Sequence, residues 1–195
     1  MISFFINLFY FKHFPFRANL SHDYFTNRQD RYIQIANTPE IADYFHGLVS
    51  TVSEFSQQLQ TDDSTVKHEN FPFHPTDTHY TRKQFKAAAR KKVVKFQSKW
   101  KDTFRHSPSK QSTDTWIVPL IQMYPFKIRQ DEVVTLELVR SAQIDCCWKL
   151  ASGYFNLTEG LMDTILQSPN KFDILMAHPK VNGFYCANGV AGRVN

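Results

Sequence analysis

Strand-like and helix-like segments alternate along the second half of the chain, and this alternation restricts the possible folds more than any other feature. Residues 116–123, 146–153 and 171–179 are apolar and strand-like, and helical patterns at 131–141 and 157–166 lie between them. Strands and helices that alternate at this spacing are typical of βαβ units, in which parallel strands form one sheet and helices cover its faces. We therefore expect an α/β fold with a mainly parallel sheet and flanking helices.

The first half of the chain begins with a similar pattern. An apolar–polar alternation at 32–36 predicts a half-buried strand. Thr38 and Pro39 then favour a helix start, because Thr caps a helix N-terminus and Pro is tolerated in the first turn. Apolar residues at helical spacing predict that this helix runs to Leu59.

Two polar segments, 60–78 and 105–114, are predicted to be linkers outside the sheets. Between them, 79–104 is predicted to be a helix with an apolar stripe of Phe85, Ala89, Val93, Phe96, Trp100 and Phe104. Its other faces carry Arg82, Lys83, Lys86, Arg90, Lys91, Lys92, Lys95, Lys99 and Lys101. Such a helix is either a domain helix with solvated charges or an amphipathic helix on an anionic membrane. It is also the best support for a nucleic-acid-binding protein, although no recognisable binding module accompanies it.

Charge and cysteine content restrict the partners only broadly. The chain has 195 residues, a formal charge of +5 and a pI near 9.1, which favours anionic partners such as phospholipid headgroups, nucleotides or nucleic acid. Its three cysteines are Cys146, Cys147 and Cys186, and no C-x-x-C motif occurs. This pattern argues against a disulfide framework or a zinc site.

The N-terminal segment 1–16 is rich in Phe and needs its own explanation. Its apolar run of about ten residues is shorter than the roughly 20 that cross a bilayer. Basic residues follow the run, whereas they precede it in a signal peptide. The segment is a signal peptide, a buried strand or a sequence foreign to the domain. It contains no Arg and is not amphipathic, so we expect no mitochondrial transit peptide here.

Three long stretches carry a family resemblance: 18–32, 114–132, and 152–163 with its continuation at 181–192. They resemble the eukaryotic mitochondrial phosphatidylglycerophosphate synthases of the phospholipase D superfamily. The resemblance implies transfer of a phosphatidyl group from CDP-diacylglycerol to glycerol 3-phosphate, with release of CMP. It also implies a peripheral position on the anionic mitochondrial inner membrane, no metal or other cofactor, and no nucleic-acid partner.

The resemblance further implies two α/β halves, each of which contributes an H-x-K-x4-D motif to one shared site. One His attacks phosphorus, the other serves as general acid and base, and the Lys residues bind phosphate oxygens. In this chain the first motif falls on Ser3, Phe5 and Tyr10, and the second is expected beyond residue 195. We therefore expect the chain as written to lack its catalytic residues. A gene-model error or a divergent strand explains the departure.

One near-match to the motif occurs at His178, Pro179 and Lys180. Tyr185 stands where the motif needs Asp, and Arg193 stands where the family has Ser. We therefore do not expect a catalytic motif there.

Four residues are expected to contact substrate. Asn19 matches the Asn that follows the first motif, and Arg28 is placed to meet a phosphate. Tyr154 and Asn156 follow a strand end, where the loops of parallel sheets form binding crevices. The structural alternatives are a turn or cap for Asn19, an ion pair for Arg28, and core packing or a helix cap for the other two.

The expected organisation has four parts. An aberrant N-terminus occupies 1–16, the end of a first phospholipase D-like half occupies 17–104, a linker occupies 105–114, and a second half begins at 115–195. The alternative function is a non-catalytic fragment that binds lipid or pairs with a complete enzyme.

Overall fold

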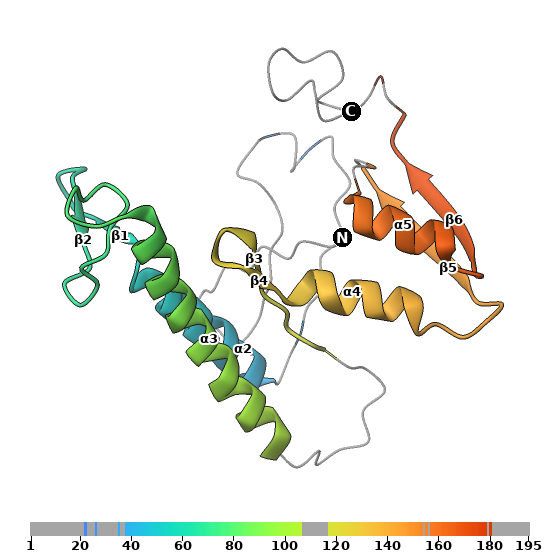
Figure 1. The fold of residues 1–195 in the computed structure, drawn as a ribbon, viewed down its shortest axis with the longest axis horizontal. Coiled ribbons are helices and arrows are strands. Elements are labelled where there is room, and N and C mark those ends of the chain that lie inside the picture. The colour runs from blue at the N-terminus through green and yellow to red at the C-terminus, as the bar shows by residue number, and fades with distance from the viewer. Residues whose placement is uncertain are drawn as a thin grey trace. The chain divides into compact units, whose positions relative to one another are not determined.

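The computed structural model contains two compact units, a helical unit and a strand–helix unit (Figure 1). The helical unit includes residues 38–106 and 124–127, and the strand–helix unit includes the described residues of 118–123 and 128–180. The residues that the structure describes are 22, 26, 35, 38–106, 117–153, 155, 157–178 and 180.

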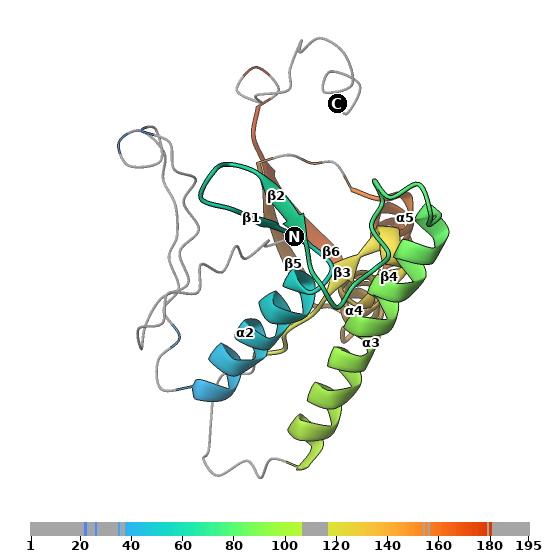
Figure 2. The same ribbon diagram turned by 90° about the vertical axis from the view of Figure 1, so that its left-hand side faces the viewer.

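Two helices pack side by side in the helical unit (Figures 1 and 2). α2 (Pro39–Ser53) begins directly after Thr38, as predicted, and the Thr38 carbonyl accepts the N–H groups of Ile41 and Ala42. α3 (Arg82–His106) confirms the predicted long helix.

A capping box fixes the start of α3. Gln84 Oε1 accepts the N–H of Thr81 at 2.8 Å, and Thr81 Oγ1 accepts the N–H of Gln84 at 3.2 Å. The reciprocal pair satisfies backbone donors that have no partner within the helix. The cap forms although the first turn carries Arg82 and Lys83 and no acidic residue, the opposite of what the helix dipole favours.

The apolar stripe of α3 faces α2. Ala89 and Val93 are fully buried, and Phe96 is 7% exposed. Tyr44 of α2 lies against Phe96 and Trp100, with ring centroids 5.1 and 5.4 Å away. Burial raises the pKa of Tyr44 to about 12, because the charged phenolate is poorly solvated among these rings.

A second aromatic cluster surrounds Phe55, which follows α2. The centroid of its ring lies 6.0 Å from that of Phe71, 6.5 Å from Phe85 and 5.6 Å from Phe126. Phe126 belongs to the short 3-10 helix η1 (Tyr124–Phe126), and its carbonyl accepts a 2.8 Å hydrogen bond from Arg90 of α3. The cluster thus joins segments far apart in sequence into one core.

The segment between α2 and α3 contains a hairpin that was not predicted. β1 (Gln57–Leu59) pairs antiparallel with β2 (Thr65–Lys67). The predicted helix to Leu59 is therefore wrong beyond Ser53, and the predicted linker 60–78 is wrong at β2.

Local hydrogen bonds explain both differences. The Ser56 hydroxyl donates to the carbonyl of Val52 at 2.8 Å, and such bonds compete with helical pairing. In the hairpin turn, Asp62 Oδ1 accepts both the N–H and the hydroxyl of Ser64, at 3.0 and 2.6 Å. Asp63 adopts a left-handed φ of 62°, which Asp tolerates better than most residues.

The strand–helix unit begins with a short antiparallel pair, β3 (Gln122–Met123) and β4 (Ile128–Arg129), and α4 (Gln130–Arg140) follows directly. The Gln130 N–H donates to the carbonyl of Ile121 at 3.2 Å, and the Gln130 side chain accepts the Ile121 N–H at 3.1 Å. These bonds tie the start of α4 to the residue before β3.

Within the described residues 117–123, the predicted strand at 116–123 is wrong except for its last two residues. Pro119 lies within this segment and has no backbone N–H to donate to a sheet. The predicted helix at 131–141 is confirmed by α4.

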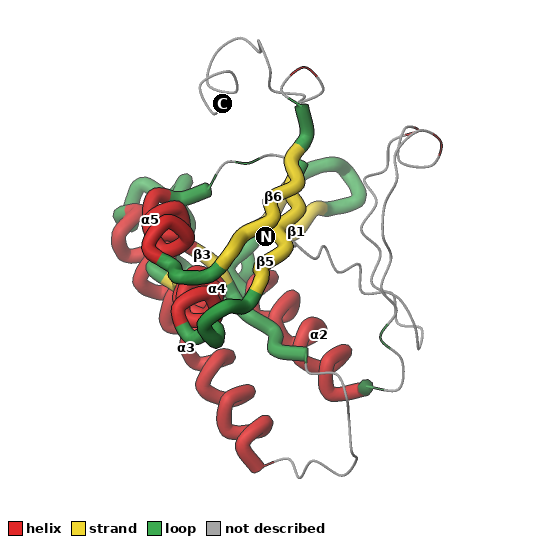
Figure 3. Tube along the Cα trace, turned by 90° about the vertical axis from the view of Figure 1, so that its right-hand side faces the viewer, coloured by secondary structure: helices red, strands yellow, loops and turns green. Residues whose placement is uncertain are grey.

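A βαβ arrangement completes the unit, and Figure 3 shows its two strands side by side. β5 (Cys147–Ser152) and β6 (Lys171–Met176) are parallel, and α5 (Glu159–Gln167) connects them. Trp148 and Phe172 are paired in register and stack with centroids 6.2 Å apart and planes at 8°. The strand, helix and strand predicted for this part of the sequence are confirmed.

The described part of the chain is a mixture of helices and small sheets. Of the three two-stranded sheets in this part, β5–β6 is parallel and the other two are antiparallel. The described residues therefore do not form the mainly parallel sheet that we expected.

Some predictions fall on other parts of the chain. The predicted strand at 32–36, apart from Ile35, and the predicted linker beyond His106 lie outside the described residues, as do residues 1–16 and Cys186. Within the described residues, none of the helices combines the length and the apolar character needed to cross a membrane.

Candidate functional site

The residues with predicted roles in catalysis or substrate binding lie outside the described residues. They are the three positions expected for the motif and the four expected substrate contacts: Ser3, Phe5, Tyr10, Asn19, Arg28, Tyr154 and Asn156. Their roles stay predictions. The structure does describe the strand from which the segment with Tyr154 and Asn156 departs.

That strand is β5, and its last residue lies at the carboxyl edge of the parallel pair. β5 ends at Ser152, which is paired in register with Met176, the last residue of β6. Parallel α/β sheets bind ligands outside the carboxyl ends of their strands. The end of β5 at Ser152 therefore lies at the edge where a binding crevice is expected.

His178 lies two residues beyond the end of β6. Its Nδ1 accepts the backbone N–H of Lys180 at 3.2 Å, a local bond typical of a turn. A strand-borne H-x-K motif would project both side chains from the sheet, whereas β6 has ended before His178. The absence of a catalytic role for His178 and Lys180 stays a prediction.

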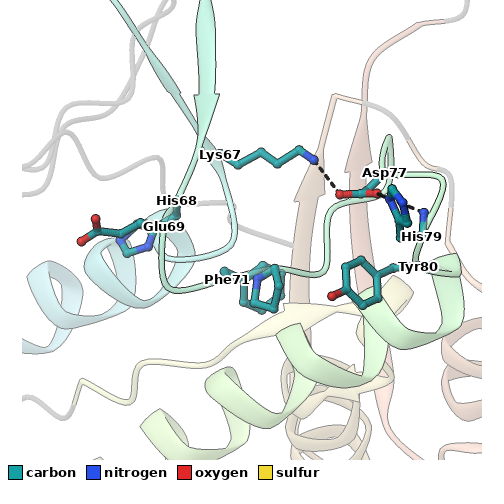
Figure 4. Close-up of a pocket in the computed structure, with 8 residues that line it drawn as sticks. Lys67, His68, Glu69, Phe71, Asp77, His79 and Tyr80 are labelled. Atoms are coloured by element: carbon teal, nitrogen blue, oxygen red, sulfur yellow. Dashed lines mark hydrogen bonds and ion pairs between the residues drawn. The ribbon is translucent and has the colours of Figure 1, made fainter.

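The helical unit has an open pocket next to β2 (Figure 4). Its volume is about 470 Å³, and its lining consists of Lys67, His68, Glu69, Phe71, Pro72, Asp77, His79 and Tyr80. The Asp77 carboxylate is the centre of the polar contacts: Lys67 Nζ lies 2.8 Å from Oδ2, and the His79 N–H and Nδ1 lie 3.0 and 2.9 Å from Oδ1.

These contacts hold the pKa of Asp77 well below its usual range. The hydrogen bond from Lys67 is the largest cause, and the two from His79 follow. The ring of His79 is 85% exposed, and a carboxylate that orients an exposed imidazole is an arrangement suited to proton transfer. The lysine is already paired with a carboxylate, so the pocket offers little unpaired positive charge to a phosphate.

No pattern in the sequence indicates the contact between Lys67 and Asp77. The spacing of Asp77 and His79 matches an Asp turn, in which the side chain accepts a hydrogen bond from the second residue along the chain. Lys67 reaches Asp77 from β2, and its position depends on the hairpin that was not predicted. Among the described residues, no group of three His, Cys, Asp or Glu side chains is arranged to hold a metal ion.

The structure separates the two interpretations of the basic helix. Phe96 and Trp100 of α3 contact Tyr44 of α2, so these rings are engaged within the protein and do not form a membrane-inserting face. α3 is a domain helix, and Lys91 and Lys95 on it are exposed. This packing is compatible with an electrostatic contact between the exposed lysines and an anionic membrane surface, because such a contact leaves the aromatic core intact.

Comparison with known proteins gives relatives over nearly the whole chain. The chain is 42% identical to the mitochondrial CDP-diacylglycerol–glycerol-3-phosphate 3-phosphatidyltransferases of Bos taurus and Homo sapiens, over 91% of its length. It is 36% identical to a protein of Dictyostelium discoideum named as a probable enzyme of the same kind, again over 91% of its length. No family model matches the chain, and no solved structure matches it.

The chain spans about a third of the length of these relatives: 35% of the Bos taurus and Homo sapiens proteins and 32% of the Dictyostelium discoideum protein. This mixed helix–strand chain is therefore homologous to a stretch of larger phosphatidyltransferases. It belongs to the family of the CDP-diacylglycerol–glycerol-3-phosphate 3-phosphatidyltransferases.

Proposed function

We propose that this chain forms part of an enzyme that transfers a phosphatidyl group from CDP-diacylglycerol to glycerol 3-phosphate and releases CMP. The observation that carries this proposal is the 42% identity to mitochondrial relatives named for that reaction. The product is a phosphatidylglycerophosphate, the precursor class for phosphatidylglycerol and cardiolipin. The names of the Bos taurus and Homo sapiens relatives support a mitochondrial location. Peripheral contact with an anionic membrane is part of the same proposal.

The architecture proposed for the complete enzyme has two phospholipase D-like halves. Residues 17–104 complete the first half and residues 115–195 begin the second. The parallel β5–β6 pair with its connecting helix is the kind of unit from which such an α/β half is built. This feature supports the proposal of a larger sheet to which β5 and β6 contribute.

Phosphate binding is the role proposed for four side chains at the shared cleft. The amides of Asn19 and Asn156 and the hydroxyl of Tyr154 donate to phosphate oxygens, and the guanidinium of Arg28 adds a charge-assisted bond. Donors of this kind stabilise the charge that develops as the phosphatidyl group transfers. Neither a metal nor another cofactor has a part in this proposal.

Catalysis by the 195-residue chain alone is not proposed. The family resemblance places the His, Lys and Asp of the first motif on Ser3, Phe5 and Tyr10, and none of these side chains can replace the missing groups. Ser3 is a weak nucleophile unless a base activates it, and Phe5 offers phosphate no positive charge. The chain supplied with both substrates is expected to release no CMP above a no-protein control.

A graft tests the proposal directly. The matching stretch of the Homo sapiens relative is replaced by residues 17–195, and CMP release is measured with CDP-diacylglycerol and glycerol 3-phosphate. Retained turnover supports the proposal, since the grafted residues then support the same chemistry. Loss of turnover in a graft that folds and stays soluble overturns it.

A further inference from the structure

Positive charge is concentrated in one helix of this chain. α3 (Arg82–His106) holds ten of the 23 Lys and Arg residues and one of the 18 Asp and Glu residues. The helix therefore carries a formal charge of +9, and the rest of the chain, which must bring the total to +5, carries −4. The modest net charge of the chain is therefore the sum of a strongly basic α3 and an acidic remainder.

The packing of α3 determines which side of the helix presents this charge. Ala89, Val93 and Phe96 are buried on the side that faces α2. Lys91 and Lys95 are exposed on the opposite side, as the 3.6-residue period requires. Further exposed cations flank them, and among the described residues no ion pair involves Lys83, Lys86, Lys91, Lys95, Lys99 or Lys101.

This distribution of charge opposes the stability of the helix. Lys86 and Arg90 are four residues apart, as are Lys91 and Lys95, and Lys95 and Lys99; like charges at this spacing repel. The cations in the first turn also oppose the helix dipole. A set of residues that breaks local stability rules without a gain in packing is typical of a functional surface.

We propose that the outward face of α3, centred on Lys83, Lys91 and Lys95, binds the surface of an anionic lipid bilayer by electrostatic attraction, without insertion of the helix. A helix of 25 residues is roughly 37 Å long, so its basic face can lie along a flat anionic surface. Val94 and Phe104, which are 38% and 40% exposed, are its partly exposed apolar residues. The proposal does not depend on the transfer reaction, because bilayer binding needs neither substrate nor turnover.

The aromatic residues of α3 favour a bilayer over a nucleic acid. Proteins that bind single strands stack bases on exposed aromatic rings. In α3, however, Phe85 and Phe96 pack against rings within the helical unit, and Trp100 lies against Tyr44. Lysines dominate the outward face and act as point charges, which suits attraction to a fluid charged surface better than planar recognition of bases.

The test is sedimentation of the full chain with phosphatidylcholine vesicles that contain or lack phosphatidylglycerol. Wild-type protein is expected to bind only the anionic vesicles, and less tightly at high salt, where charges are screened. Each lysine near an anionic surface changes the partition coefficient about fivefold, so the variant K83Q/K91Q/K95Q should bind about a hundredfold more weakly. K83R/K91R/K95R, which keeps the charge, should bind like wild type.

The matched control is K149Q/K171Q/K180Q, which removes three exposed cations from the other unit. Gln has a helix propensity close to that of Lys, so the α3 variant should melt like wild type. Weak binding by the α3 variant and near-normal binding by the control support the proposal. Equal loss in both triple variants, equal binding to neutral vesicles, or tighter binding to an oligonucleotide than to anionic vesicles overturns it.

Discussion

Gly47 lies within α2 on the side that meets α3, and its lack of a side chain has a structural reason. Glycine in a helix interior is less favourable than alanine by about 1 kcal/mol. A Cβ at this position would lie 3.0 Å from the ring of Phe96 and 3.6 Å from Nε1 of Trp100. The first distance is tighter than an ordinary van der Waals contact, so a side chain larger than a methyl group must displace the Phe96 ring.

These distances predict how much a substitution at Gly47 changes the free energy of unfolding. In Gly47→Ala the propensity gain of about 1 kcal/mol is offset by the tight contact, and the free energy of unfolding should change by less than about 0.5 kcal/mol. Gly47→Leu forces further carbons against Phe96 and should destabilise the chain by about 2 kcal/mol. Urea unfolding followed by far-UV circular dichroism measures both.

A leucine at an exposed position of the same helix is the control. Ser50→Leu places the same side chain three residues further along α2, where the residue is exposed, and should change the free energy of unfolding by less than about 0.5 kcal/mol. Equal midpoints for Gly47→Leu and Ser50→Leu would refute the packing of α2 on α3 described above.

Two further predictions follow from hydrogen bonds to carboxylates. The pKa of Asp77 is lower in the folded chain than in the unfolded one, so its contribution to stability is present above the unfolded pKa of about 4 and is lost as pH falls below it. The urea midpoint of Asp77→Asn should therefore fall less than that of wild type between pH 7 and pH 3, and an equal fall would count against the Lys67–Asp77 contact. Cys147 Sγ donates to Asp173 Oδ2 at 3.3 Å, which raises the pKa of the thiol. Asp173→Asn should accelerate alkylation of Cys147 by iodoacetamide at pH 8 relative to Cys146, and an unchanged ratio would exclude the bond.

Local periodicity accounts for the elements that could be predicted. α3, α4 and α5 each have apolar residues at helical spacing, and β5 and β6 are apolar runs bounded by polar residues. These patterns depend on neighbouring residues alone, so they can be recognised without knowledge of the tertiary structure.

The missing elements depend on contacts that periodicity does not contain. β1 and β2 are three residues each, too short for an alternation to be visible, and they form because Gln57 pairs with Lys67 across a turn. Phe126 joins the aromatic cluster of Phe55 and Phe85 although it lies tens of residues away. The opposite error occurs at 116–123, where an apolar run predicts a strand of which only Gln122–Met123 forms within the described residues. Pro119 in this run has no backbone N–H to donate to a sheet.

Local sequence patterns likewise predict only part of the candidate site, and the rest depends on tertiary contacts. The local pattern predicts a strand that ends at Ser152 and Gly153, and β5 does end at Ser152. The contact between Lys67 and Asp77 required the unpredicted hairpin. The roles of Tyr154 and Asn156 came from the family resemblance, because residue type alone does not distinguish a substrate contact from a core residue or a cap.

The most direct test of the account compares two grafts in the Homo sapiens relative. One graft carries residues 17–195 in place of the matching stretch, and the other carries residues 1–195, so that Ser3, Phe5 and Tyr10 also replace the first motif. CMP release is measured for both with CDP-diacylglycerol and glycerol 3-phosphate. We expect turnover by the first graft and none by the second. Turnover by the second graft, or no turnover by the first when both grafts are folded, would be evidence against the proposed function.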